Sequence, residues 1–170
     1  MSDFVFSSRN LDDTARLATA LADLLPLCAI VTLDGPLGAG KTRLVQGLAA
    51  ACGIDPRDVT SPTFVLIHEY HGRRDLFHFD AYRIRDDDEF LALGPEEYFE
   101  RAGVTLVEWA SRVERCLPDE RLEIRIEVTG ENSRRFHIRA IGEEHRNEAY
   151  RNVVEQLPKA LGCPADGESN

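Results

Sequence analysis

A glycine-rich segment of eight residues constrains the fold of this chain more than any other part of the sequence. It reads Gly35-Pro36-Leu37-Gly38-Ala39-Gly40-Lys41-Thr42 and matches the phosphate-binding pattern G-x4-G-K-[ST]. Glycines let the backbone turn its N–H groups toward phosphates, and a helix that begins at Lys41 adds the positive end of its dipole. An apolar run precedes the segment and a helical pattern follows it. The segment therefore predicts an α/β domain of the P-loop NTPase type.

The polar positions of this loop suit a nucleoside triphosphate with Mg²⁺. We expect Lys41 to neutralise the β- and γ-phosphates and the Thr42 hydroxyl to ligate Mg²⁺. Only two of the 20 basic residues are lysines, Lys41 and Lys159, so a chain that otherwise uses arginine has lysine where the loop requires it. Further contacts with the phosphates are expected from the backbone of Gly35, Leu37, Gly38, Ala39 and Gly40.

Two acidic residues stand where a sheet would bring them to the loop. Asp80 ends the run 76–79 and Glu108 ends the run 104–107. The carboxyl ends of strands in open α/β sheets are where ligands bind, and Mg²⁺ takes one or two carboxylates beside water. We expect Glu108 to be the metal ligand because its strand is the more hydrophobic. Asp80 is predicted to be a second metal ligand, a water-orienting base or a nucleotide contact.

The remaining hydrophobic pattern predicts a mostly parallel central sheet flanked by helices, with antiparallel hairpin strands. The continuous apolar run 29–31 is typical of a parallel strand covered on both faces, and Asn10 is a candidate helix cap. Strands are expected at 4–6, 27–33, 64–70, 75–80, 104–107, 122–128 and 135–141. Helices are expected at 10–25, 41–51, 86–93, 96–101, 109–116 and 143–161. We expect one domain over residues 1–161 and a disordered C-terminal tail over 162–170.

Composition limits the partners of the chain. Its 30 acidic and 20 basic residues give a net charge of −10, and the longest basic clusters are Arg73-Arg74 and Arg134-Arg135. Such a surface repels a phosphate backbone unless basic groups gather in one place, so we expect a protein partner rather than tight autonomous binding of nucleic acid. No apolar run is long enough to span a bilayer, and the start of the chain shows no export signal. We therefore expect a cytoplasmic protein.

Several other residues allow a functional and a purely structural interpretation. The Ser61-Pro62-Thr63 segment suits either a hydroxyl-bearing switch loop that senses the γ-phosphate or a plain solvent turn. His78 is expected to be packed, and Trp109 to be a core residue that reports nucleotide binding. For the adenine pocket, the only candidates are 10–11 and 132–134. Among the cysteines, Cys28, Cys52 and Cys116 are expected in the core and Cys163 as a free thiol in the tail.

Four blocks together resemble the signature blocks of the TsaE (YjeE) family, in the same order and at similar spacing. The resemblance covers roughly residues 11–128. The four blocks are Gly35–Thr42, Ser61-Pro62-Thr63-Phe64, His78-Phe79-Asp80-Ala81-Tyr82-Arg83 and Val107-Glu108-Trp109.

The resemblance implies a bacterial ATPase that is required to form threonylcarbamoyladenosine at position 37 of tRNAs reading ANN codons. It implies that the ATPase resets or activates a complex of TsaB with the transferase TsaD, and that tRNA is met only through that complex. By motif, Thr42 and Glu108 would ligate Mg²⁺, Lys41 would bind the phosphates of ATP, and Asp80 would support hydrolysis. Ser61 and Thr63 would lie in the switch-like loop.

Two positions depart from the family pattern. Pro36 stands where the family usually has Asp, and Ala110 where it usually has Pro. Pro36 has no N–H, so a backbone donor at that point of the loop is lost. Neither departure removes one of the side chains expected to bind phosphate or metal.

Two other functions are compatible with the residues alone. One is a small phosphotransferase, such as a nucleotide or metabolite kinase; no arginine-rich lid insert is evident, although Arg83 and Arg85 are candidates for such a role. The other is a nucleotide sensor that does not hydrolyse. A GTPase switch is disfavoured, since neither Lys41 nor Lys159 stands in an NKxD motif.

Overall fold

A seven-stranded mixed sheet forms the centre of the computed structural model, which describes residues 2–60 and 66–163. The strands are β1 (Asp3–Ser8), β2 (Cys28–Asp34), β3 (Ile67–Tyr70), β4 (Leu76–Asp80), β5 (Gly103–Glu108), β6 (Arg121–Val128) and β7 (Arg134–Ile141). Their order in the sheet is β1-β7-β6-β2-β5-β4-β3. The central strands β6, β2, β5 and β4 are parallel, while β7 pairs antiparallel with β1 and β6, and β3 with β4. The predicted α/β class with a mostly parallel centre and antiparallel hairpin strands is confirmed.

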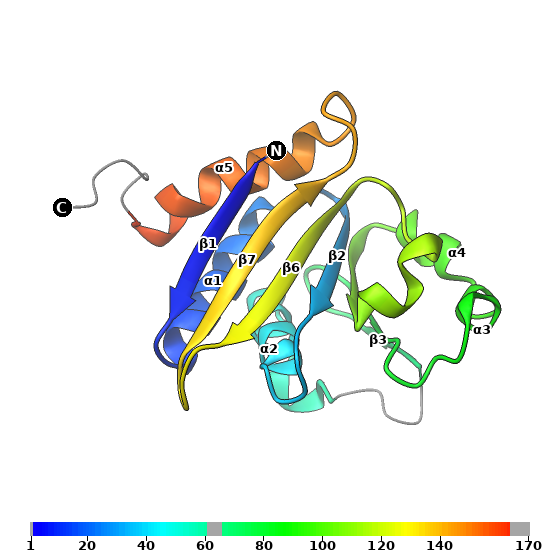
Figure 1. The fold of residues 1–170 in the computed structure, drawn as a ribbon, viewed down its shortest axis with the longest axis horizontal. Helices are drawn as coiled ribbons and strands as arrows, with labels where there is room; N and C mark the ends of the chain where they lie inside the picture. Colours follow the sequence, from blue (N-terminus) through cyan, green and yellow to red (C-terminus); the bar gives the residue numbers. More distant parts are fainter. Residues whose placement is uncertain (1, 61–65, 164–170) are drawn as a thin grey trace.

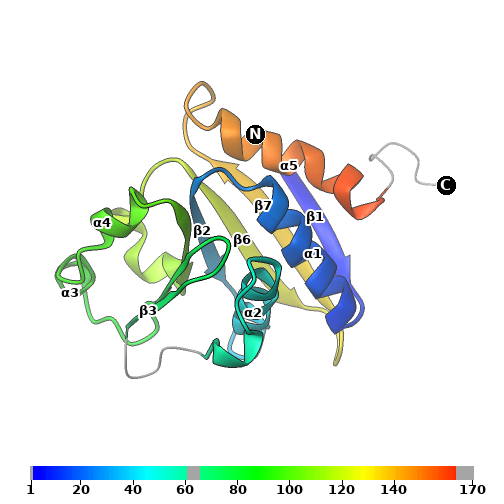
Figure 2. The same cartoon turned by 180° about the vertical axis from the view of Figure 1, so that it is seen from behind.

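The helices lie on both faces of this sheet. They are α1 (Leu11–Leu24), α2 (Lys41–Ala51), α3 (Asp87–Leu91), α4 (Pro95–Phe99) and α5 (Glu148–Leu161), with the short 3₁₀ segments η1 (Pro56–Asp58) and η2 (Ala110–Cys116). Figure 1 and Figure 2 show α1, α2 and α5 on one face of the strands β1, β7, β6 and β2. The aromatic residues Phe77 and Phe79 of β4 pack on the opposite face in a second, smaller core that includes residues of α3, α4 and η2.

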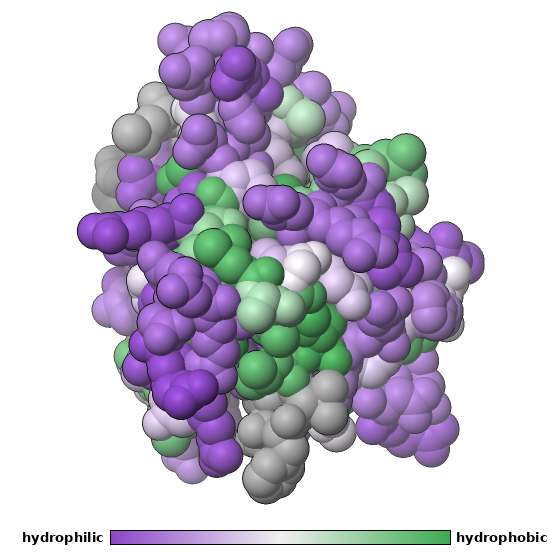
Figure 3. Space-filling model, turned by 90° about the vertical axis from the view of Figure 1, so that its right-hand side faces the viewer, coloured by the Kyte–Doolittle hydropathy of each residue, from purple (hydrophilic) through white to green (hydrophobic). Residues whose placement is uncertain are grey.

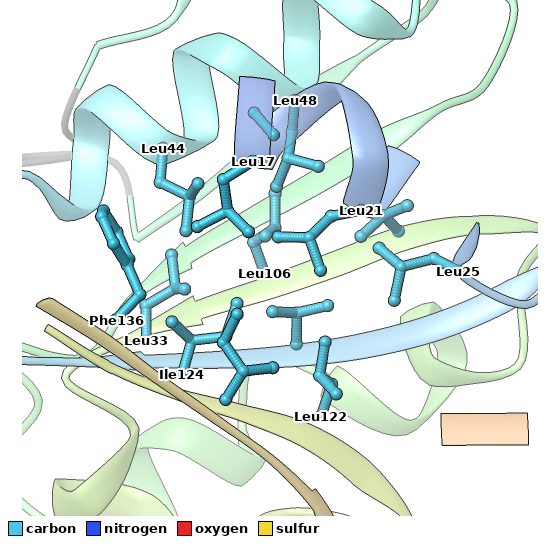
Figure 4. Packing of buried hydrophobic residues seen from close by; sticks show 14 of the residues in the cluster. Leu17, Leu21, Leu25, Leu33, Leu44, Leu48, Leu106, Leu122, Ile124 and Phe136 are labelled. Atoms are coloured by element: carbon cyan, nitrogen blue, oxygen red, sulfur yellow. The ribbon is translucent and has the colours of Figure 1, made fainter. Parts of the chain in front are cut away.

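The main core forms where the apolar stripes of α1 and α2 meet the sheet. Asn10 begins α1 by accepting the Asp13 N–H at 2.9 Å, as its sequence position predicts. Leu17 and Leu21 of this helix are fully buried, and Figure 4 shows them beside Leu44 and other buried leucines. Each such burial contributes about 1.5–3 kcal/mol relative to an exposed side chain. This packing fixes α2, and with it the loop before α2, against the carboxyl ends of the central strands.

Two predicted helices differ from the observed ones by more than shifts of one or two residues at their ends. The segment 109–116 is a 3₁₀ stretch with a kink at Val113 rather than one α-helix. Its start is held elsewhere: the Trp109 N–H donates to Leu33 O at 2.9 Å, and the Ser111 N–H donates to Asp34 Oδ1 at 3.2 Å. The expected helix 143–161 begins only at 148, because a turn at 143–147 closes first.

The start of β3 and the cysteines agree only in part with the sequence predictions. The strand expected at 64–70 is observed from 67, and residues 61–65 lie outside the described part of the chain. Cys52 is buried as expected, but Cys28 is exposed at the first position of β2 and Cys116 is only half-buried. Cys163 packs partly against the main core. The tail beyond residue 163 is not described, so its predicted disorder stays a prediction.

The side of the molecule that carries α3 and α4 is largely hydrophilic around a central area of apolar residues (Figure 3). Two of the acidic residues at the start of α3 have local tasks. Asp86 accepts the Glu89 N–H at 2.9 Å, and Glu89 accepts the Arg85 N–H at 2.7 Å.

No helix among the described residues is long and apolar enough to cross a membrane.

Candidate functional site

The glycine-rich loop turns between the end of β2 and the start of α2. Gly38 and Gly40 have left-handed backbone angles, with φ of 76° and 101°, which side chains with a Cβ rarely adopt. Gly40 precedes α2 directly, and no side chain among the described residues caps the helix at this position. The first N–H groups of a helix have no partner within it, so the loop presents donors and a positive dipole end at one point. Such an arrangement suits an anion.

Lys41 lies across this loop. Its Nζ donates to the carbonyls of Gly35 at 2.7 Å and Pro36 at 3.0 Å, and lies 4.0 Å from the centre of the Trp109 ring. Burial lowers the pKa of the Lys41 ammonium, and the nearby carboxylate of Glu108 acts against this shift. The loop therefore holds a partly dehydrated cation beside acidic groups. Pro36, which cannot donate, contributes its carbonyl.

Sheet register brings the two predicted carboxylates together. Asp80 at the end of β4 pairs with Glu108 at the end of β5 in parallel register. Paired residues of adjacent strands point to the same face, so both side chains lie on the same side of the sheet. Asp80 is 8% exposed and Glu108 is 2% exposed. Asp80 Oδ1 accepts the Tyr82 N–H at 2.9 Å, which fixes the turn after β4.

Glu108 is the centre of a hydrogen-bonded group at this end of the sheet. Thr42 Oγ1 donates to Glu108 Oε1 at 3.1 Å, so the first turn of α2 and the end of β5 are joined. His78 Nε2 lies 2.8 Å from the same oxygen. Thr42 and Glu108, the two predicted metal ligands, are thus in direct contact, and their binding of Mg²⁺ stays a prediction.

Trp109 closes one side of the group with an unusual backbone. Its φ of 57° makes it the only described residue other than glycine with a positive φ, a conformation that costs roughly 1–2 kcal/mol. Its ring lies 4.9 Å from that of Tyr82, and Arg112 donates to the Tyr82 carbonyl. Trp109 is half-buried and packs against the second core, which bears out the expected core role in part, and its ring also covers the Lys41 ammonium.

Two cavities flank the loop. One, of about 410 Å³, is lined by the loop together with the carboxylates and the aromatic pair: Leu37, Gly38, Ala39, Gly40, Lys41, Thr42, Arg43, Asp80, Tyr82, Arg83, Glu108 and Trp109. The other, of about 550 Å³, lies between the loop, the start of α1 and the β6–β7 turn. It is lined by Asn10, Leu11, Asp12, Thr14, Gly38, Ala39, Gly40, Arg43, Glu131, Asn132, Arg134 and Phe136. Both segments named as candidates for a base pocket line this second cavity.

Arg134 connects the second cavity to the loop. Its Nε donates to the carbonyl of Ala39 at 2.9 Å, and one terminal nitrogen lies 3.4 Å from the carbonyl of Gly38. The guanidinium also donates to the carbonyl of Gly130 at 3.0 Å in the β6–β7 turn. Arg134 binds the carbonyls of Gly38 and Ala39 on one side of the loop. It therefore favours a loop conformation in which the N–H groups point away from Arg134.

The donor set of the first cavity fits Mg²⁺ with a phosphate ligand. Thr42 and Glu108 offer a hydroxyl and a carboxylate, the hard oxygen ligands that this ion prefers. In the ranges 2–60 and 66–163, no group of three or more His, Cys, Asp or Glu side chains could hold a metal ion. An ion at Thr42 and Glu108 would therefore complete its shell with phosphate and water oxygens, as Mg²⁺ does in nucleotide sites.

The structure brings most of the predicted site residues together and adds others. Residues 37–42 of the loop line one cavity together with Asp80 and Glu108. Gly35 does not line this cavity but accepts a hydrogen bond from the Lys41 ammonium through its carbonyl, and Ser61 and Thr63 lie outside the described residues. Sequence reasoning gave His78 only a packing role. Its position two residues before Asp80, on the same face of one strand, was the signal for its contact with Glu108. Arg134 was named only as part of the candidate base segment 132–134; its contact with the loop carried no local signal, because it depends on a turn far along the chain.

A comparison with known families identifies the chain. The family model described as "Threonylcarbamoyl adenosine biosynthesis protein TsaE" matches residues 8–136, which include the loop, both carboxylates and Arg134. This chain belongs to the TsaE family. The match extends beyond the 11–128 span of the sequence resemblance at both ends.

Relatives within the TsaE family are similar over most of their length. A protein from Treponema pallidum, named tRNA threonylcarbamoyladenosine biosynthesis protein TsaE, is 40% identical over 131 residues, covering 77% of this chain and 96% of its own. The protein of the same name from Bacillus subtilis is 40% identical over 146 residues, covering 85% and 90%. The crystal structure of Bacillus subtilis YdiB superposes with a TM-score of 0.75 at 35% identity, covering 92% of this chain and 95% of that one.

Proposed function

We propose that this TsaE-family chain binds ATP with Mg²⁺ at the loop 35–42 and hydrolyses it in support of threonylcarbamoyladenosine formation on tRNA. The modification itself, at position 37 of tRNAs that read ANN codons, would be carried out by the TsaB–TsaD complex. The chain would act as its accessory ATPase and meet tRNA only through that complex. The family and its relatives support the pathway, and the site supports the chemistry.

The observation that carries the proposal is the meeting of Lys41, Thr42 and Glu108 at the start of α2. Thr42 and Glu108 share a hydrogen bond of 3.1 Å, and Lys41 lies in the same cavity. A phosphate chain at this helix end would meet backbone donors, a fixed cation and an oxygen pair suited to a metal. These are the parts that a P-loop NTPase uses.

Each side chain has a separate task in this proposal. Lys41 neutralises phosphate oxygens, and its low exposure strengthens that interaction. Thr42 and Glu108 hold Mg²⁺, which supplies charge neutralisation to the phosphates when bound. Asp80, in register with Glu108, orients the attacking water and accepts its proton.

The base of the nucleotide fits the cavity between α1 and the β6–β7 turn. This cavity of about 550 Å³ shares Gly38, Ala39 and Gly40 with the phosphate cavity, so one ligand can occupy both. Asn10, Asn132 and Glu131 supply amide and carboxylate groups for hydrogen bonds to the ring edge. We therefore assign the base to this cavity and the phosphates to the other.

One observation favours testing phosphotransfer as a second candidate. Arg83 lines the phosphate cavity, where an arginine could stabilise a transferring phosphoryl group, whereas Arg85 pairs with Glu89 at the surface. A kinase would form ADP in proportion to an added acceptor. An accessory ATPase would form ADP and inorganic phosphate without one.

The test is a steady-state measurement of phosphate release, with this chain titrated with the TsaB–TsaD complex and tRNA. We expect slow turnover by the chain alone, faster turnover with the complex, and threonylcarbamoyladenosine in digests of the tRNA. Many turnovers per second by the isolated chain, with no effect of the complex, would instead indicate a self-contained hydrolase or kinase. ATP binding without phosphate release in any mixture would indicate a sensor.

A further inference from the structure

His78 is buried beside the site, and its ring makes a short hydrogen bond with Glu108. The side chain is 0% exposed, and its Nε2 lies 2.8 Å from Glu108 Oε1. The other ring nitrogen, Nδ1, is buried and has no hydrogen-bond partner among the described residues. The neighbours of His78 on its strand, Phe77 and Phe79, are apolar and fully buried, as core positions usually are.

The contacts decide which ring nitrogen carries the proton. A carboxylate oxygen can only accept, so the 2.8 Å contact is a hydrogen bond only if Nε2 bears hydrogen. A proton on Nδ1 alone would leave a buried donor unpaired and place two acceptors face to face. His78 therefore donates from Nε2 to Glu108 Oε1, and Thr42 of α2 donates to the same oxygen.

The two donors together hold the Glu108 carboxylate from two directions. Thr42 belongs to α2 and His78 to β4, while Glu108 ends β5. A carboxylate on a single side-chain stem rotates unless its oxygens are held, and metal ligands are commonly oriented by such outer hydrogen bonds. An apolar side chain at position 78 would fill the same space but would leave Glu108 with one donor fewer.

We propose that His78 is a positioning residue that holds the Glu108 carboxylate in the orientation required for binding Mg²⁺ with the nucleotide. This rests on the proposed function of the site. His78 itself touches neither phosphate nor metal. It acts through Glu108.

Three substitutions separate the hydrogen bond from the packing. His78→Gln keeps an N–H donor near the position of Nε2, whereas the shorter His78→Asn has a donor that does not reach Glu108. His78→Leu removes the donor altogether. His68→Gln is the matched control, because His68 pairs with His78 across β3 and β4 but bonds to Tyr70 at 2.9 Å instead of Glu108.

The first measurement needs no nucleotide. Long-range ¹H–¹⁵N spectra of the free protein are expected to show a proton on Nε2 of His78, the ring nitrogen that faces Glu108. Its signals should shift in Glu108→Gln and stay in place in His68→Gln. A proton on Nδ1 alone, with none on Nε2, or a His78 signal that does not respond to Glu108→Gln, would contradict the proposed contact.

The second measurement is the Mg²⁺ dependence of nucleotide binding, followed by the fluorescence of Trp109, the only tryptophan. Loss of an outer hydrogen bond to a metal ligand typically costs about 10–100-fold in metal affinity or activity. We expect His78→Asn and His78→Leu to raise the half-maximal Mg²⁺ concentration by about this factor and to lower kcat. KM for ATP should change little, because the loop and Lys41 are untouched. His78→Gln should recover most of both effects.

The comparison of Gln with Asn decides the matter even if the Leu variant does not fold. Equal impairment of His78→Gln and His78→Asn, with native circular dichroism, would overturn the positioning role and leave only packing. Native Mg²⁺ dependence and turnover in His78→Asn would overturn it as well, while the proposed function would stand. If the wild-type chain itself shows no Mg²⁺-dependent nucleotide binding, both are overturned.

Discussion

Replacing Glu108 by Gln separates the chemical role of this residue from its structural one. Glu108 is 2% exposed and accepts from His78 at 2.8 Å and Thr42 at 3.1 Å. The amide oxygen of Gln can accept the same two hydrogen bonds in nearly the same volume. We therefore expect the free energy of unfolding to change by no more than about 1 kcal/mol, since weaker bonds to a neutral acceptor are offset by the lower cost of burying it.

Hydrolysis should respond differently from stability. An amide is a poor ligand for Mg²⁺ and brings no negative charge to the site. Removal of a group that stabilises the transition state electrostatically costs about 2.7–4 kcal/mol of barrier, so turnover should fall by about 100–1000-fold. ADP binding should remain, because Lys41 and the loop are unchanged.

Glu108→Ala is the informative contrast. It leaves the buried His78 Nε2 without its acceptor, which costs about 1–3 kcal/mol of stability. For a chain of this length, each kcal/mol lowers Tm by about 2–4 °C. The assay combines thermal unfolding with phosphate release in the presence of the TsaB–TsaD complex. Wild-type turnover in folded Glu108→Gln that still binds ATP would refute this reasoning and move the metal-binding role to Asp80.

Three further changes test other parts of the structure. Arg134→Ala should weaken ATP binding by about tenfold or more, because loss of the contacts with the loop carbonyls of Gly38 and Ala39 should cost roughly 1.4 kcal/mol of binding free energy. The control in the same calorimetric titration is Arg135→Ala, since the Arg135 side chain pairs with Glu127 at the surface. Gly35→Ala should lower the free energy of unfolding by about 1–3 kcal/mol, because φ of Gly35 is 156° and the added Cβ would lie 2.7 Å from the Ile126 carbonyl oxygen. An unchanged midpoint in denaturant unfolding would contradict this. The chain alone, with its net charge of −10, should not bind tRNA in an electrophoretic mobility shift assay at physiological salt. Submicromolar binding that weakens steeply with salt would contradict this and indicate a basic surface that the sequence does not show.

The sequence predicted the sheet and the loop because their signals are local. The apolar run of β2, the glycines of the loop and the cap at Asn10 each determine structure within a few residues. Asp80 and Glu108 could be placed together from their positions at strand ends alone, since parallel neighbours deliver such residues to one edge.

Contacts between distant segments could not be predicted in the same way. The 3₁₀ stretch after Trp109 exists because its N–H groups are used by Leu33 and Asp34 of another strand. The later start of α5 follows from a turn that forms after β7. Arg134 reaches the loop only once the sheet has placed the β6–β7 turn beside it. Each of these features depends on tertiary structure that local patterns do not encode.

Binding of ATP with Mg²⁺ at the loop 35–42 is tested most directly by calorimetric titration of the chain with Mg-ATP. The two lysines provide a matched pair of variants: Lys41 lies over the loop, and Lys159 lies exposed in α5. We expect Lys41→Ala to abolish high-affinity binding while circular dichroism stays native, because the loop loses its fixed cation beside several negative oxygens. Lys159→Ala should bind as the wild type does. Wild-type affinity in Lys41→Ala, or no binding in either variant or the wild type, would contradict the assignment of this loop.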